Sequence, residues 1–370
     1  MGYERYRKEV QKKNISFTVL GHEECDMCKL QSMHAKTCDR TNVVKCGTCD
    51  EYEEHMKRAR EGRSEYRKDA DREWAENEVV NSADLIKISL IPILPHKVAV
   101  FTPRLIAFNE TFAPLEKQGE KRANRQKPLA LLWHEATAGR DTEDTAANYW
   151  AFLRQHRGKN KVTLFVDNCS AQNKSWVLIT VLLTFVQQAA NVTNVITLKF
   201  LEPGHTSMNA DAAHQLVQKK LSKAKEVSDF RDFTDLVETS GMQVKVLEHP
   251  DFYQFEDGVS KTKLNLLGRE GLRPYLRTAR VIRVKRGSHK VFSKTAHSDN
   301  QWRAFDLLKS TYDPAAAPDK RSEPRGINQN KIDRVCQSLV PLIVPHMRQF
   351  WLQLQEKQRG KSKSVRDLTG

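Results

Sequence analysis

The sequence lacks a long apolar segment. Its longest apolar run, from Trp176 to Val186, is shorter than the roughly 20 residues that a transmembrane helix needs. The N-terminal stretch MGYERYRKEV lacks the apolar core of a signal peptide, and Tyr6 stands where a myristoylation motif requires Ser or Thr. We therefore expect a protein without a membrane partner that stays inside the cell.

Two further features are missing. No glycine-rich phosphate loop follows the first expected strand, which argues against a dinucleotide-binding α/β fold. No coiled-coil heptads are present, so the sequence gives no argument for a dimer, and self-association stays an open possibility.

Acidic residues are outnumbered by basic ones. The 370 residues include 61 Lys and Arg against 46 Asp and Glu, which gives a net charge of +15. Such an excess favours an anionic partner, with DNA as the first expectation and the nucleus as the expected location. The competing interpretation is a solvated basic surface without a specific partner.

Cysteine is unevenly distributed. Five of the seven cysteines lie between residues 25 and 49, in the order C-x2-C, a single cysteine, then a second C-x2-C. In an intracellular protein this spacing predicts zinc ligands more readily than disulfides. The candidate ligands are Cys25, Cys28, His34, Cys38, Cys46, Cys49 and His55.

The spacing leaves two arrangements of these ligands open. One zinc ion could take the four paired cysteines. Alternatively, Cys25, Cys28, His34 and Cys38 could hold one ion, while Cys46, Cys49 and His55 hold a second. The metal is expected to be structural, because so short a segment cannot bury a sufficient core by itself.

The rest of the chain divides by composition. We expect a zinc-binding module at 1–55, a charged and mostly solvated helix at 56–77, an α/β domain at 78–225, a basic α+β region at 226–318, and a helical segment with a basic tail at 319–370. In the last part, Trp351 and Phe350 are expected to pack on the core, in a segment interrupted by Pro341 and Pro345.

The pattern of the α/β domain is three strands, then helix, strand, helix, strand, helix. The expected strands lie at 79–92, 97–115, 128–136, 161–167 and 194–206, and the helices at 141–157, 175–189 and 209–224. The segment 97–115 reads as one strand or two short ones. This order is that of a ribonuclease H-like mixed sheet, in which a three-strand meander is extended by parallel strands with crossover helices.

Three aspartates occupy positions where such a sheet gathers functional groups. Asp167 ends the fourth strand, Asp84 lies on the first, and Asp211 begins the last helix. Carboxylates packed together repel one another and call for divalent cations, here Mg²⁺ or Mn²⁺. The competing interpretations are a strand-edge acid for Asp84 and a helix cap for Asp211.

Three neighbouring residues are weaker candidates. Glu135 follows the third strand and is either a fourth metal ligand or a surface residue. His205 is a candidate general base, or it satisfies loop carbonyls. His214, on the same helix face as Asp211, is expected to pack.

Several segments together resemble a family of transposon-associated proteins, present in many copies in animal genomes, with a ribonuclease H-like, transposase-like core. They are ADLIKISLIPILP at 83–95, FTPRLIAFNETFAPL at 101–115, WHEATAGR at 133–140, VDNCSAQNK at 166–174, PGHTSMNADAAH at 203–214, and PRGINQNKIDRV with PLIVPHMRQFW within 324–351. The resemblance implies a DNA strand-transfer or nuclease ancestry, with Asp84, Asp167 and Asp211 at the three acidic positions.

A basic stretch follows the α/β domain. Between Gly271 and Ser298 there are eight Lys or Arg and no acid, and apolar residues alternate with basic ones as in a strand with one basic face. The candidate nucleic-acid contacts are Arg277, Arg280, Arg283, Lys285, Arg286 and Lys290. A solvated strand edge is the alternative.

Together these features predict a DNA-binding protein with a transposase-like, two-metal core for DNA cleavage and strand transfer, and a structural zinc module. One alternative is a metal-dependent exonuclease that uses Asp84, Glu135, Asp167 and Asp211, with a histidine just before the last acid. The other is an inactive copy that binds DNA or protein.

Overall fold

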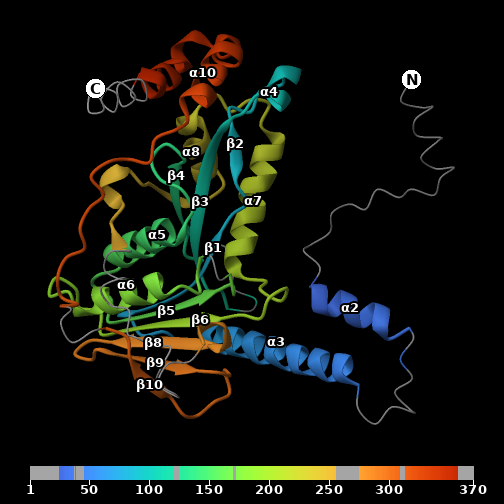
Figure 1. Ribbon diagram of the computed structural model, residues 1–370, viewed down its shortest axis with the longest axis vertical. Coiled ribbons are helices and arrows are strands. Elements are labelled where there is room, and N and C mark those ends of the chain that lie inside the picture. The colour runs from blue at the N-terminus through green and yellow to red at the C-terminus, as the bar shows by residue number, and fades with distance from the viewer. Residues whose placement is uncertain are drawn as a thin grey trace, which may run out of the picture.

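The computed structural model describes residues 25–36, 38, 46–117, 119, 125–169, 172–255, 275–308 and 313–356. It confirms a mixed α/β architecture, in which one large sheet carries helices on both faces (Figure 1). No helix within these ranges has the length and apolar character needed to cross a membrane.

The described part of the chain contributes ten strands and several helices. The strands are β1 (Glu78–Leu85), β2 (Ser89–Ile91), β3 (Leu105–Pro114), β4 (Leu129–His134), β5 (Lys161–Val166), β6 (Val195–Phe200), β7 (Gln243–Val246), β8 (Val281–Lys285), β9 (Lys290–Lys294) and β10 (Arg303–Asp306). The α-helices are α2 (Asp26–His34), α3 (Gly47–Asp71), α4 (Lys97–Phe101), α5 (Thr142–Gln155), α6 (Trp176–Gln187), α7 (Asn209–Lys223), α8 (Phe230–Thr239) and α10 (Gln329–Ser338).

The sheet has the strand order β10-β9-β8-β6-β5-β1-β3-β4-β7, with β2 paired to β3. β1, β3 and β4 are antiparallel neighbours, whereas β5 and β6 run parallel to β1. In this register Ala83 of β1 lies between Phe112 of β3 and Val166 of β5. The carboxyl ends of β1, β5 and β6 therefore share one edge, and this edge carries the predicted acids.

Apolar side chains fill both faces of the sheet. On one face, α5 and α6 pack against the strands, and Phe112 of β3 stacks on Phe152 of α5 with ring centres 4.2 Å apart. On the other face, α7, α8 and α10 share a core with β3 and β4, and α3 packs against β1 and β5. Each large side chain buried here contributes about 1.5–3 kcal/mol.

Helix α3 differs from the solvated helix expected from its charge. It begins at Gly47, and its buried residues recur at helical spacing from Cys49 through His55, Ala59 and Tyr66. The Tyr66 ring packs edge-on against Phe165 of β5, with centroids 4.9 Å apart. One face of α3 is thus part of the core, and only the opposite face is solvated.

The segment Lys97–Phe101 is a helix rather than the predicted strand. Its apolar side chains suggested a β-strand, but the chain leaves the sheet after β2, and residues 97–101 pair with none of the described strands. Val100 and Phe101 remain exposed. Strand β3 begins only at Leu105.

The C-terminal part extends the sheet at both ends. β7 lies parallel to β4 at one edge, and β8–β10 continue antiparallel from β6 at the other (Figure 1). Trp351 is fully buried, and its indole N–H donates to the Ser228 carbonyl at 3.0 Å, which confirms its predicted packing.

Candidate metal sites and basic surface

An acidic group lies at the carboxyl end of β1. Asp84 is the next-to-last residue of this strand, and α7 crosses it with Asp211 in its first turn and His214 in its second. His214 Nδ1 lies 3.4 Å from Asp84 Oδ2, and the ligand atoms of all three residues lie within 4.8 Å of one another. His214, expected only to pack, is therefore part of this group.

The start of α7 is fixed by polar contacts from three directions. Asp211 Oδ2 accepts the backbone N–H of Met208 at 2.6 Å, as the helix-cap interpretation expects. The Tyr66 hydroxyl of α3 accepts the N–H of Asn209 at 2.9 Å, and Ser82 Oγ of β1 accepts that of Ala210 at 3.0 Å. Asp211 is thereby positioned relative to both β1 and α3.

Asp167 is oriented by the loop that follows β5. Its Oδ1 accepts the Cys169 N–H at 3.1 Å and the Asn173 amide at 2.6 Å. Asn173 Oδ1 in turn accepts the Tyr149 hydroxyl of α5 at 2.6 Å. The strand ends on a carboxylate whose direction is set by a buried hydrogen-bond chain.

The acids repel one another electrostatically. Burial raises the pKa of Asp167, and the charges of Asp84 and Asp211 raise it further, against the hydrogen bonds from Asn173 and Cys169. Burial likewise raises the pKa of Asp211, with Asp84 adding to the effect. A divalent cation would relieve this repulsion, and the group formed by Asp84, Asp211 and His214 could hold one.

A fourth carboxylate, which the sequence did not bring to notice, lies beside them. Glu110 of β3 pairs in register with Leu85 and is only 1% exposed. Burial and the nearby Asp84 and Asp167 charges raise its pKa well above the ordinary value. The available signal was an acid inside the otherwise apolar strand LIAFNETFAP.

The structure places two predicted site residues elsewhere. Glu135 accepts the Ile106 N–H at 2.8 Å and pairs with Lys331, so it ties β4 to β3 and α10. His205, expected as a general base, lies instead among the cysteines, with its Nε2 3.3 Å from Cys28 Sγ. Neither residue belongs to the acidic group formed by Asp84, Asp211 and His214.

The cysteines and histidines form two sets of four. One comprises Cys25, Cys28, His55 and His205, and the other His34, Cys38, Cys46 and Cys49. Within the first, Cys25 Sγ lies 3.2 Å from His55 Nε2. Within the second, His34 Nε2 lies 3.0 Å from Cys46 Sγ, which is 3.8 Å from Cys38 Sγ.

These distances suit zinc. Tetrahedral zinc with bonds of about 2.3 Å to sulfur and 2.0 Å to nitrogen places its ligands roughly 3.3–3.8 Å apart. Sulfur and imidazole donors in fours are the usual structural zinc sites. Both Cys/His sets could therefore hold a metal such as zinc.

The structure groups these ligands differently from both arrangements proposed from spacing, and helix geometry explains the difference. Cys28 and His34 lie on one helix, six residues apart, which is about 9 Å along the axis. Cys49 and His55 have the same separation on α3. Each helix therefore contributes one ligand to each of the two sets.

The first Cys/His set also joins the N-terminal segment to the core. His205 lies in the loop between β6 and α7, and His55 Nδ1 lies 3.0 Å from the buried Glu202 Oε1 at the start of that loop. Arg58 and Arg280 also pair with Glu202, at 3.1 and 2.9 Å. Such a carboxylate fixes the orientation of a ligating imidazole.

Gly204 allows this close approach. Its φ is +74°, and a Cβ placed there would lie 2.5 Å from Cys25 Cβ. Only glycine satisfies both the left-handed backbone and the contact. The segment PGHT thus combines a glycine that allows the close approach with a histidine that could bind a metal ion.

Two of the six predicted nucleic-acid contacts are held internally. Arg280 pairs with Glu202. Arg286 donates to the backbone carbonyls of Thr193, Gln188 and Asn191. These two arginines therefore have a structural role in the molecule.

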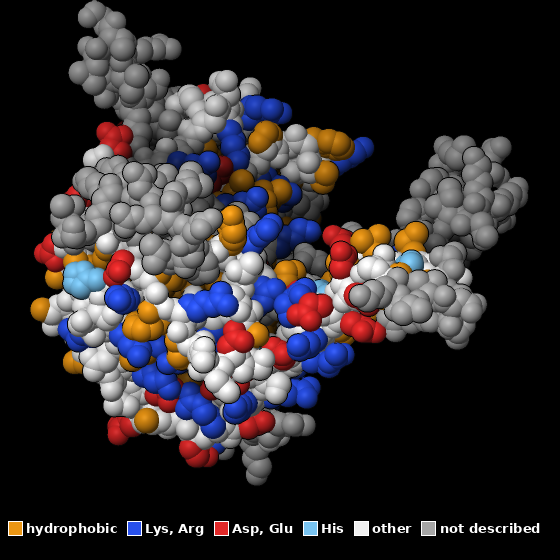
Figure 2. Space-filling view, turned by 60° about the horizontal axis from the view of Figure 1, so that its bottom comes forward, with side chains coloured by type: hydrophobic (Ala, Val, Ile, Leu, Met, Phe, Trp, Pro, Cys, Tyr) orange, Lys and Arg blue, Asp and Glu red, His pale blue; other side chains and the backbone are white. Residues whose placement is uncertain are grey.

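The other basic residues lie on or near the β8–β9 hairpin. Arg283 and Lys294 lie over the Trp302 ring at 4.1 and 4.7 Å, and Lys285 lies over Phe292 at 4.7 Å. Arg277 and Lys290 are exposed. Figure 2 views the molecule from the side of α3 and β8–β10, and Lys and Arg side chains spread over this face among fewer acids.

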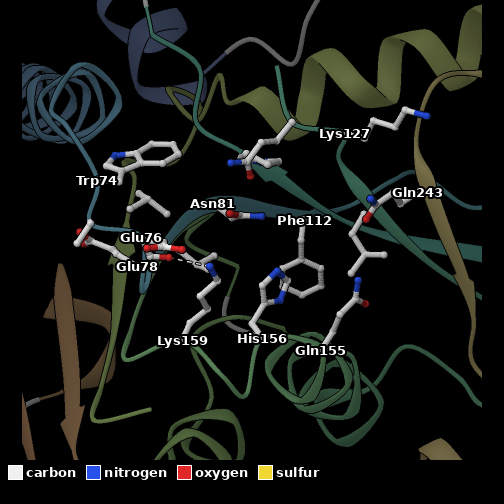
Figure 3. Close-up of a pocket in the computed structure, with 16 residues that line it drawn as sticks. Trp74, Glu76, Glu78, Asn81, Phe112, Lys127, Gln155, His156, Lys159 and Gln243 are labelled. Atoms are coloured by element: carbon white, nitrogen blue, oxygen red, sulfur yellow. Dashed lines mark hydrogen bonds between the residues drawn. The ribbon is translucent and has the colours of Figure 1, made fainter. Parts of the chain in front are cut away.

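A cavity of about 650 Å³ lies at the opposite edge of the sheet, where β1 begins (Figure 3). Trp74 and Glu78 lie on one side of it, and Gln155, Lys127 and Gln243 on the other. None of the acidic-group residues lines it. The acids therefore lie outside this pocket.

Comparisons with known proteins add little to this geometry. A family model described as a domain of unknown function, DUF7869, matches residues 130–268, a segment with Asp167, His205 and Asp211 but without Asp84. A search of curated proteins finds no match. One chain of a simian T-cell lymphotropic virus intasome in complex with PP2A regulatory subunit B56 gamma is similar at 13% identity and a TM-score of 0.27, over 65% of this chain and 84% of that chain. A TM-score this low carries no argument.

Proposed function

We propose that the chain is a DNA-binding protein with a ribonuclease H-like core that performs two-metal phosphoryl transfer, either DNA cleavage or strand transfer. The observation that carries the proposal is the approach of Asp211 and His214 of α7 to Asp84 of β1, with Asp167 directly after the adjacent parallel strand β5. After burial, the charges of Asp84 and Asp211 raise the pKa of Asp167, and that of Asp84 raises the pKa of Asp211, which supports the grouping.

The topology supports the same core. The strands β6-β5-β1-β3-β4 combine an antiparallel meander with two parallel strands, and α5 and α7 occupy opposite faces. This is the arrangement that the ribonuclease H-like interpretation of the sequence requires. The two flanking additions, β7 and β8–β10, lie outside it.

The residues have separable roles in such a reaction. Mg²⁺ or Mn²⁺ bound at this edge would activate a water or a 3′-hydroxyl and stabilise the oxygens of the displaced phosphate. Asp84 and Asp211, with His214, supply one face of the site. Asn173 and Tyr149 hold the Asp167 carboxylate in position.

DNA binding is assigned to the β8–β9 face. Cations over aromatic rings, as at Trp302, form platforms that can track a phosphate backbone and stack on bases. The Cys/His sites act as structural zinc sites that hold α2 and α3 on the core. We place the protein in the nucleus, where its DNA substrate is.

The exonuclease alternative has less support. Its histidine would be His205, which contacts Cys28, and its fourth acid Glu135, which is paired with Lys331. The inactive DNA-binding copy is an outcome of the test that follows.

The test is cleavage of labelled single- and double-stranded DNA with Mn²⁺ by the zinc-loaded chain and by Asp167→Asn. We expect nicking or joining by the wild type and a loss of at least about 100-fold in the variant, because the metal then loses a ligand charge. DNA binding should persist, and Asp235→Asn on α8 serves as the control. Absence of cleavage by a folded, zinc-loaded wild type would contradict catalysis and favour the inactive binding protein.

A further inference from the structure

Asn81 places a buried amide in the middle of β1. The residue is 5% exposed. Val79 and Ala83, two residues to either side, pack in the core that α5 covers, so the Asn81 side chain leaves the sheet on this same face. Among the described residues, none forms a hydrogen bond with this side-chain amide. A buried polar group without a partner is costly, and its presence calls for an explanation.

The amide points into the cavity of about 650 Å³ at the start of β1 (Figure 3). This volume lies within the range of about 300–1,000 Å³ that is usual for sites that bind small molecules. Trp74 and Phe112 contribute aromatic rings to the lining, and the exposed Gln155 and Gln243 contribute further amides. The cavity therefore combines apolar ring surface with a few hydrogen-bonding groups, as ligand sites do.

His156, which directly follows α5, is a second polar group of this lining. Its Nδ1 lies 2.9 Å from the Phe152 carbonyl, and because a carbonyl only accepts, Nδ1 carries the proton. Nε2 is then an acceptor, and no described residue donates to it. Burial lowers the pKa of His156, and the Lys159 charge lowers it further, against the hydrogen bond to Phe152, so the ring is neutral at pH 7.

The two groups together complement an adenine base. Adenine presents an amino group beside a ring nitrogen, and a side-chain amide binds this pair with two hydrogen bonds. Asn81 would accept one amino hydrogen and donate to the ring nitrogen, which leaves the second amino hydrogen for His156 Nε2. Hypoxanthine, which has a carbonyl instead of the amino group, would place an oxygen acceptor against the Nε2 acceptor.

We propose that this cavity binds an adenine base, which Asn81 and His156 recognise and the aromatic lining contacts. The cavity lies where β1 begins, whereas Asp84 lies near the other end of the strand, so the inference does not depend on the acidic group. The base could belong to a mononucleotide or to an unpaired DNA strand. The recognised chemistry is the same, and the experiment separates the two sources.

The experiment is a calorimetric titration of the zinc-loaded full chain with adenosine monophosphate. We expect saturable binding of one nucleotide per chain. Inosine monophosphate, which carries hypoxanthine, should bind at least about tenfold more weakly, because a site built to pair with an amino group rejects a carbonyl.

Two variants test the residues that recognise the base. Asn81→Leu removes the amide at similar volume, and His156→Phe removes the acceptor but keeps a ring. Each should bind adenosine monophosphate at least about tenfold more weakly than wild type does. Asn330→Leu, the same type of change at an exposed position of α10, is the control and should bind as wild type does.

Thermal unfolding separates ligand loss from misfolding. Asn81→Leu should melt at or above the wild-type temperature, because an apolar side chain replaces a buried amide without a partner. Unchanged zinc content and circular dichroism would show that the fold is retained. If Asn81→Leu does not fold, His156→Phe decides the test.

Competition with short single strands identifies the source of the base. Displacement of adenosine monophosphate by oligodeoxyadenylate, but not by oligodeoxythymidylate of the same length, would assign the cavity to an unpaired DNA strand. Displacement by neither strand would assign it to a mononucleotide.

Four results overturn the inference. They are no binding of adenosine monophosphate to wild type, equal affinity for inosine monophosphate, wild-type affinity in the folded variants, and equal displacement by the two strands. None of these results bears on DNA cleavage, so the proposed function stands or fails separately.

Discussion

Glu78, the first residue of β1, shows how single ion pairs shape the pH response of this protein. Its Oε1 lies 2.6 Å from Arg72 Nη2 and 2.9 Å from Lys161 Nζ, so one carboxylate joins the end of α3 to β1 and β5. Burial raises the pKa of Glu78, but the hydrogen bonds from Arg72 and Lys161 outweigh it and lower the pKa to about 2.

The sign of the resulting pH effect follows from linkage. Because the folded pKa lies below the unfolded value of about 4.3, the ionised carboxylate stabilises the fold above that pH. The contribution is lost as the pH falls toward 2. Glu78→Gln should therefore lower the free energy of unfolding at pH 7 by about 1–3 kcal/mol and flatten its decrease between pH 4.5 and 2.

Chemical denaturation at a series of pH values measures this difference. Glu76→Gln, an exposed glutamate two residues earlier, is the control and should leave the curve unchanged. If the unfolding free energy of Glu78→Gln fell between pH 4.5 and 2 as steeply as that of wild type, other carboxylates would be responsible for the decrease.

The site residues differ in how far the sequence could reveal them. The positions of Asp84, Asp167 and Asp211 on or after strands and at a helix start were predictable, because these ends are visible in the apolar pattern. The buried position of Glu110 was not singled out, although this residue stands between Phe108 and Phe112 in the alternation of β3. The neighbours of His205 were not predicted, because its cysteine partners lie some 180 residues earlier in the chain, with Cys28 at a separation of 177.

At the scale of elements, the β8–β9 hairpin is the part whose alternating pattern was most informative. This stretch was expected as a strand with one basic face, and in the structure it forms two strands that pair antiparallel, with Val281 opposite Lys294. The pattern could not predict which partner each basic side chain contacts. Arg286 donates hydrogen bonds to backbone carbonyls, whereas Arg283 and Lys294 both lie over the ring of Trp302, which is outside the hairpin.

The hairpin face makes a prediction about DNA affinity. Replacing Arg283, Lys285 and Lys294 together by Gln removes three cations from this face. The slope of log affinity against log salt should fall in magnitude by up to about 2.7, because each lost phosphate contact releases about 0.9 counterion fewer. Binding of a DNA duplex at several salt concentrations, followed by fluorescence anisotropy, measures the slope.

The matched control changes the same charge elsewhere. Lys219, Lys220 and Lys223 lie near the C-terminal end of α7, and all three are exposed. Their triple replacement by Gln should leave the salt slope within experimental error. Equal effects of the two triple variants would assign DNA binding to overall charge rather than to the hairpin face.

Element order was easier to predict than element partners. The alternation of strands and helices from 79 to 224 follows from runs of apolar residues and from caps such as Asp141, which accepts the N–H groups of Glu143 and Asp144. The parallel pairing of β7 with β4 joins segments more than 100 residues apart, and no local pattern encodes it. The ligand partition of the Cys/His sets likewise depends on how α2 lies against α3.

At the scale of the whole molecule, the first Cys/His set joins the N-terminal segment to the core. Cys25 and Cys28 come from the α2 segment, His55 from α3, and His205 from the loop that leads into α7. That same loop ends at Met208, whose backbone N–H donates a hydrogen bond to Asp211 Oδ2. A metal ion here would therefore hold together the parts of the chain that position the acidic group.

Gly204→Ala tests this connection. The added Cβ would lie 2.5 Å from Cys25 Cβ and 2.9 Å from Cys25 Cα, so the α2 segment must move away from the loop. We expect the variant to bind one zinc ion per chain where wild type binds two, and to lose about 1–2 kcal/mol or more in unfolding free energy through the left-handed backbone alone. Elemental analysis of the purified chain counts the zinc.

Gly287→Ala distinguishes the contact from the backbone strain. Gly287 has a similar φ of +69°, but nothing lies within 4 Å of the position its Cβ would take. This variant should show the strain cost and still bind two zinc ions. If Gly204→Ala also retained both ions, the approach of Cys25 to the loop would not be required for metal binding, and the N-terminal segment would be held on the core by the α3 face alone.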